Sequence, residues 1–165
     1  MTGDFIDEKT LRRMYEDHGG IKLDYETDAG IDIGYVGDFY ALLRAIDEVV
    51  PRGSVMYAEG QPADEIRAFL MEHGASVRQR VWRGTFFPEP ECFHLAIERD
   101  NLTRFRKIAD KYAEPEIAYH LVVYDADGVL VSAYDAGDDN VGLSARLGEA
   151  AIQQFKIIAE AVKGE

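Results

Sequence analysis

Residues 120–134, HLVVYDADGVLVSAY, combine two β-strand patterns with a turn sequence between them. Residues 125–128, DADG, suit a type I turn in which Gly128 adopts the left-handed conformation and makes a β-bulge, so that Asp125 lies opposite Val129. Strand alternation then predicts one core face and one mixed face. The expected core face carries Leu121, Val123, Val129, Val131 and Ala133, and the expected opposite face carries His120, Val122, Tyr124, Leu130, Ser132 and Tyr134.

Helical and strand patterns alternate along the rest of the chain. Helices are expected over residues 7–19, 38–50, 62–74, 100–113 and 144–162, and further strands over 31–35, 55–58, 77–87, 92–98, 118–125 and 129–135. This order predicts a single α+β domain spanning residues 1–165, with a mixed sheet of about five to six strands packed by about five helices, and residues 1–20 as a peripheral N-terminal helix. Two strand-helix-strand units, 31–58 and 92–125, align Arg44 with Arg106 and Ile46 with Ile108, which indicates an internal duplication.

Composition limits the classes of protein to which the chain can belong. Its 165 residues are 47% hydrophobic, enough for one buried core, and Cys92 is its only cysteine, which excludes an internal disulfide and a zinc site built on several thiolates. No signal peptide or membrane span is recognisable, so we expect a cytoplasmic protein without membrane contact. The net charge of −13, from 31 acidic and 18 basic residues, should repel nucleic acid and attract a basic protein partner.

Two of the four histidines, His94 and His120, fall in predicted strands on the face away from their apolar neighbours. One helix connects these strands, so they should run parallel; if they are neighbours, the imidazoles stand at similar depth. With Tyr124, Tyr134 or Cys92 nearby, the pair could bind a metal or an anionic ligand, or transfer protons. The alternative is that each imidazole packs beneath a helix and hydrogen-bonds to backbone or to a tyrosine hydroxyl.

A basic segment interrupts the acidic sequence. From His73 to Pro88 the chain contains no Asp and no Glu. Strand alternation places Arg78, Arg80 and Trp82 on one side. Guanidinium groups beside an indole suit a phosphate, a carboxylate or a planar ring. The alternative is a solvated strand face whose arginines pair with cross-strand glutamates.

Two functional hypotheses follow, and neither includes a cofactor or a metal. The first is a non-enzymatic adaptor or inhibitor-type protein that engages a basic protein partner through exposed carboxylates. The second is a site for a small anionic ligand, or a hydrolytic site, at His94 and His120 with nearby tyrosines and Arg78 or Arg80. No glycine-rich phosphate loop and no Gly-x-Ser-x-Gly elbow is present, so the sequence does not decide whether the protein is an enzyme, and it does not determine the oligomeric state.

Overall fold

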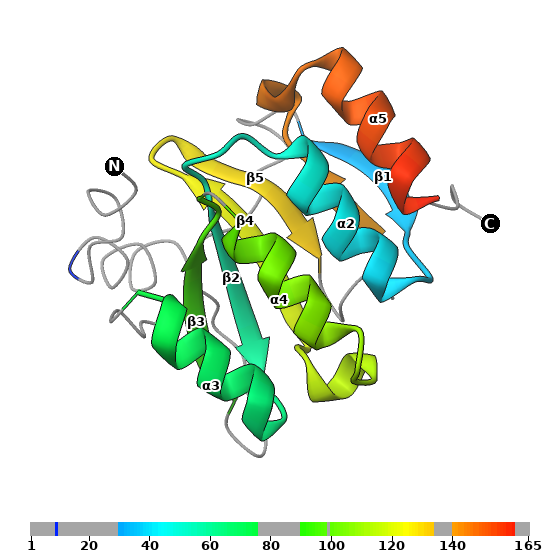
Figure 1. Cartoon of the computed structure of the whole chain (residues 1–165). Coiled ribbons are helices and arrows are strands. Elements are labelled where there is room, and N and C mark those ends of the chain that lie inside the picture. Colours follow the sequence, from blue (N-terminus) through cyan, green and yellow to red (C-terminus); the bar gives the residue numbers. More distant parts are fainter. Residues whose placement is uncertain (1–8, 10–29, 76–89, 99, 134–139, 161–165) are drawn as a thin grey trace.

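The computed structural model describes residues 9, 30–75, 90–98, 100–133 and 140–160, which form an α+β structure around a six-stranded sheet (Figure 1). The strands are β1 (Ile31–Tyr35), β2 (Val55–Gly60), β3 (Glu91–Ala96), β4 (His120–Asp125), β5 (Gly128–Ala133) and β6 (Asn140–Leu143), in the order β1-β6-β5-β4-β2-β3. Every pairing is antiparallel, so the predicted mixed sheet is wrong. Strands β3 and β4 do run parallel to each other, as expected, but β2 lies between them and pairs with both.

Four α-helices occur within the described residues, and all four contribute side chains to one core on the same face of the sheet (Figure 1). They are α2 (Phe39–Val49), α3 (Asp64–His73), α4 (Asn101–Ala109) and α5 (Glu149–Ala159). The helix expected over residues 7–19 and the strand expected over 77–87 lie outside the described residues. No helix in the described part of the chain is long and apolar enough to cross a membrane.

The boundaries of the helices follow local chemistry. The Asp38 side chain caps α2 by accepting hydrogen bonds from the backbone N–H groups of Tyr40 and Ala41. The helix ends at Val49, with Val50 as its C-cap, and Pro51 follows, which cannot continue a helix. The helix predicted from residue 144 starts later than expected. Ser144 caps a short 3-10 turn instead, Ala145–Leu147, and α5 follows Gly148, whose φ is 92°.

The helix-covered face of the sheet is apolar. Its strand residues in the core are Met56, Ala58, Phe93, Leu95, Leu121, Val123, Leu130, Val131, Ala133, Val141 and Leu143. They pack against helix residues that recur at helical spacing, among them Leu42 and Ile46 of α2, Phe105 of α4 and Phe155 of α5. The alternation predicted for β3, with Phe93 and Leu95 toward the core and His94 away from it, is confirmed.

The β4–β5 hairpin has its bulge at a different position from the one predicted. Leu121, Val122 and Val123 face Ala133, Ser132 and Val131, as expected. The irregularity then falls between Val123 and Tyr124, so that Tyr124 pairs with Val129 and Asp125 with Gly128 rather than with Val129. Consequently Leu130, and not Val129, belongs to the core cluster.

The sheet contains a strand that the sequence did not predict and lacks the predicted duplication. Strand β6 has only four residues, Asn140–Leu143. It pairs with both β1 and β5 and so lies between these two strands in the sheet. In the first proposed repeat, three strands lie between β1 and β2 in the sheet. In the second, only one strand lies between β3 and β4, so the two units are not equivalent.

Substitution of Gly60 by alanine should destabilise the fold. A Cβ atom at Gly60 would lie 2.8 Å from the backbone nitrogen of Tyr119 and 3.1 Å from the Cα of Ala118, where the chain entering β4 crosses the end of β2. Because backbone atoms would have to move, Gly60→Ala should lower the free energy of unfolding by about 1–3 kcal/mol in urea denaturation. Gly37→Ala is the matched control: no atom lies within 4 Å of its Cβ position. An equal change in both variants would contradict the close approach.

Candidate functional site

The sheet face opposite the helices carries buried polar side chains, which we call the polar row. Its members are Tyr57, Glu59, Cys92, His94, His120, Tyr124 and Ser132. Register places them together: Glu59 of β2 lies opposite Cys92 of β3 and His120 of β4, and Tyr57 lies opposite His94. His94 is 0% exposed and His120 is 6% exposed, so both imidazoles are inside the protein.

Hydrogen bonds join five members of the polar row in two groups. The Tyr57 Oη lies 2.8 Å from Glu59 Oε2 and 3.1 Å from Cys92 Sγ. His94 Nδ1 lies 2.7 Å from the Tyr124 Oη, and the His94 ring also stacks at a tilt on Tyr57, with 5.0 Å between centroids. Burial raises the pKa of Tyr57, with further contributions from Cys92 and Glu59, and burial also raises the pKa of Tyr124. Both hydroxyls therefore stay protonated at neutral pH.

The two histidines of the sequence-based hypothesis share a face but are not neighbours. They are two strands and two residues apart, which corresponds to roughly 12 Å between Cα atoms from the strand spacing and rise. His120 has Glu59 as its cross-strand neighbour. His94 has Tyr57 as its cross-strand neighbour and hydrogen-bonds to Tyr124, which was predicted to lie near the histidines. A single ligand at both imidazoles would have to reach across β2.

Other predicted site residues are not placed, and one member of the row was not predicted. Tyr134, Arg78, Arg80 and Trp82 lie outside the described residues. Glu59 was missed because the second strand was expected to end at Ala58, although a carboxylate directly after a buried segment was a usable signal. Within the described ranges, no three His, Cys, Asp or Glu side chains are arranged to hold a metal ion.

A second feature, which we call the arginine pocket, opens between α2 and α4. It is a hollow of about 540 Å³ lined by Arg44, Asp47, Glu48, Val50, Arg52, Thr103, Arg106 and Gln154. These residues come from α2, the turn after it, α4 and α5. The sequence comparison that paired Arg44 with Arg106 named two of its members, but it was interpreted as a duplication.

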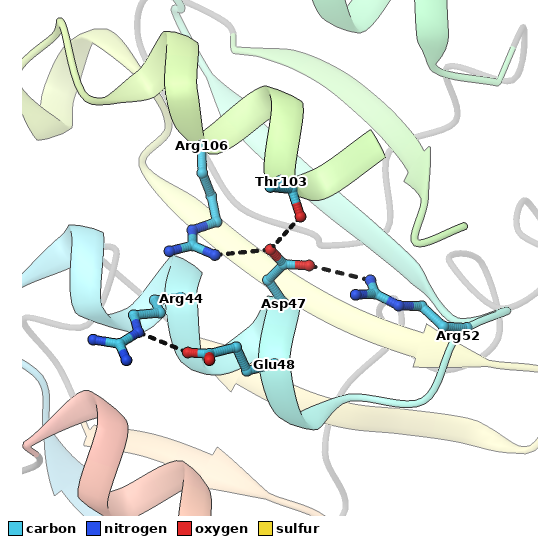
Figure 2. Close-up of polar contacts among 6 residues, drawn as sticks. All are labelled: Arg44, Asp47, Glu48, Arg52, Thr103 and Arg106. Atoms are coloured by element: carbon cyan, nitrogen blue, oxygen red, sulfur yellow. Dashed lines mark hydrogen bonds and ion pairs between the residues drawn. The ribbon is translucent and has the colours of Figure 1, made fainter. Parts of the chain in front are cut away.

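Asp47 organises the arginine pocket (Figure 2). Its carboxylate is only 4% exposed; Oδ2 accepts hydrogen bonds from Thr103 Oγ1 and Arg106 Nη1, both at 2.8 Å, and Oδ1 accepts one from Arg52 Nη1 at 3.1 Å. Burial by itself would raise the pKa of Asp47, but the three donors outweigh it and lower the pKa below its usual value. The carboxylate is therefore ionised at neutral pH and ties α2 to α4.

The three guanidinium groups keep donors for another partner. Arg52 and Arg106 each contact Asp47 through Nη1, and Arg44 contacts Glu48 Oε2 through Nε at 2.6 Å (Figure 2). Within the described residues these are their only ion-pair contacts. A guanidinium has five N–H donors, so each arginine retains several. The pocket can therefore offer hydrogen bonds and positive charge to an oxyanion.

No protein-family model, no curated protein and no solved structure matches this chain. The geometry of the candidate sites is therefore the only basis for assigning them a function. Of the two, the polar row is buried within the protein, whereas the arginine pocket opens to solvent through side chains that are about half exposed: 58% for Arg44 and 50% for Arg52. The arginine pocket is the better candidate for a site that a dissolved ligand can enter.

Asp47→Asn should destabilise the protein in a pH-dependent way. At pH 7 the loss of the ionised acceptor should lower the free energy of unfolding by about 1–3 kcal/mol. Because the folded pKa of Asp47 lies below its unfolded value, the stability that this carboxylate adds is complete above pH 4 to 5 and is lost as pH falls through the folded pKa. The difference between variant and unmodified protein should therefore narrow on acidification.

Urea denaturation at several pH values between about 7 and 2 measures this difference. Glu48→Gln is the control, because Glu48 is 42% exposed and its pair with Arg44 should contribute no more than about 0.5 kcal/mol. A stability difference for Asp47→Asn that stays constant down to acidic pH would show that the charge of Asp47 does not carry the effect.

Proposed function

We propose that this chain is a non-enzymatic binding protein whose arginine pocket holds the oxyanion group of a small ligand. The observation that carries the proposal is the convergence of Arg44, Arg52 and Arg106 on one hollow of about 540 Å³, with a single nitrogen of each engaged in an ion pair inside the protein. Phosphate and carboxylate groups match the fork geometry of guanidinium donors.

Asp47 supports this function by fixing the donors in advance. Arginine side chains lose rotamer freedom when they bind a ligand, and this loss weakens affinity. The contacts of Arg52 and Arg106 with the buried Asp47 carboxylate already restrict both side chains in the free protein. The lining contains three arginines and two carboxylates, a formal excess of one positive charge in a chain of net charge −13. The pocket is thus locally suited to an anion despite the acidic surroundings.

Arg52→Gln should weaken oxyanion binding. Ethyl phosphate is a suitable probe, and we expect it to bind the unmodified protein with a dissociation constant of about 1 mM, measured by NMR titration. Loss of one charged donor should weaken binding by about tenfold. Arg67→Gln is the control, because Arg67 pairs with Asp64 and Glu91 and does not line the pocket. Absence of binding to the unmodified protein, or equal weakening in both variants, would refute the proposal.

A basic protein partner is the second candidate function, and the distribution of ion pairs favours it. Among the described residues, Arg44, Arg52, Arg67, Arg106, Lys111 and Arg146 are held in ion pairs within the molecule. Exposed carboxylates such as Asp100, Asp127, Glu149 and Glu160 form no ion pair with any other described residue. The surplus negative charge is therefore available at the surface for a basic partner.

Complex formation with a basic partner should depend strongly on ionic strength. Capture from native lysate should retain a stoichiometric basic protein near 0.1 M salt and release it at about 1 M, where the screening length falls to about 3 Å. Simultaneous replacement of Asp127 and Glu149 by the corresponding amides tests whether exposed carboxylates contribute. If no protein is retained at any ionic strength, this second function is ruled out.

A further inference from the structure

A second hollow adjoins the arginine pocket, and we call it the aspartate hollow. It has a volume of about 240 Å³ and is lined by Asp38, Tyr40, Ala41, Leu43, Arg44, Arg106 and Asp110. Arg44 and Arg106 line both hollows, so the two spaces meet at this pair of guanidinium groups. A ligand whose oxyanion contacts Arg44 and Arg106 can therefore extend into the aspartate hollow.

The aspartate hollow holds two carboxylates beside the two guanidinium groups that it shares with the arginine pocket. Asp110 is the C-cap of α4, where the carbonyl end of the helix carries partial negative charge that Arg106 and Lys107 in the last turn offset in part. Asp38 uses Oδ1 for both capping hydrogen bonds of α2, which leaves Oδ2 outside them. Neither Asp38 nor Asp110 forms an ion pair with another residue that the structure describes.

Tyr40 adds an aromatic surface to these carboxylates. Its hydroxyl donates to the Tyr112 carbonyl just beyond the end of α4, which holds the ring across the α2–α4 boundary. The residue remains 38% exposed and lines the hollow. Ammonium groups bind favourably on tyrosine ring faces.

We infer that the ligand of the arginine pocket is a small zwitterion, with its oxyanion at Arg44, Arg52 and Arg106 and an ammonium group in the aspartate hollow against Asp38, Tyr40 and Asp110. This inference rests on the proposed oxyanion-binding function and adds the chemical class of the ligand. The aspartate hollow adds Asp38 and Asp110 to the shared Arg44 and Arg106, so the lining of the two adjoining hollows together offers both positive and negative groups to one ligand. A ligand with both charges matches both kinds of group, whereas a purely anionic ligand of the same length meets two carboxylates.

O-phosphoethanolamine and ethyl phosphate form a matched pair of probes, because they differ only in the ammonium group. NMR titration of the unmodified full chain should show that phosphoethanolamine binds about fivefold tighter than ethyl phosphate, the gain expected for one ammonium between exposed carboxylates and a ring. Asp110→Asn should remove this gain and leave ethyl phosphate binding no weaker. Asp127→Asn, an exposed residue on the β4–β5 turn, changes the net charge equally and should preserve the gain.

Each outcome decides one of the two claims. Equal binding of the two probes overturns the zwitterion inference and leaves the oxyanion proposal standing. A gain that survives in Asp110→Asn, or that falls equally in Asp127→Asn, also overturns it, because general attraction to an acidic protein would then explain the preference. If neither probe binds, both claims fall.

Discussion

The contact on which the α2–α4 arrangement depends is the ion-pair cluster at Asp47. A carboxylate that is 4% exposed has lost most of its hydration, and only hydrogen-bond donors can replace the lost water. Those donors are Thr103 and Arg106 on α4 and Arg52 in the turn after α2. The apolar core fixes the distance of both helices from the sheet, but an apolar contact has no direction. The carboxylate adds direction, and in doing so it determines where the guanidinium groups of the pocket stand.

The two faces of the sheet have different kinds of interior. The helix-covered face is an ordinary apolar core, whereas the opposite face buries hydroxyls, a carboxylate, a thiol and imidazoles. A tyrosine whose pKa is raised by burial is a hydrogen-bond donor and not a base. The described contacts of the polar row, Tyr57 with Glu59 and Tyr124 with His94, are therefore those of a hydrogen-bond network that fixes the packing of this face. The arginine pocket, by contrast, opens to solvent.

Sequence periodicity predicted the core-facing side of most of the strands it covered, though not of β5 around Val129 and Leu130, because side-chain direction is a local property of a helix or strand. The alternation of β3 is confirmed for this reason. Strand order is not a local property. The position of β2 between β3 and β4 could therefore not be predicted from the sequence around His94 and His120. The short strand β6, with a glycine among its four residues, gave too little pattern to recognise. The arginine pocket was missed because Asp47 and Arg106 are 59 residues apart and meet only when the helices pack.

The acidity of the chain and an anion pocket are compatible because they act over different distances. The net charge of −13 is felt out to about one screening length, roughly 8 Å at physiological ionic strength, and it disfavours the approach of any strongly anionic molecule. Contact with guanidinium donors acts within hydrogen-bond distance, where geometry rather than net charge sets the energy. A nucleic acid presents many phosphates and meets the long-range repulsion in full. A small zwitterion carries its own compensating charge, so it passes through the same field at little cost. On the proposed function, the surplus of carboxylates would select, by their charge, the ligands that reach Arg44, Arg52 and Arg106.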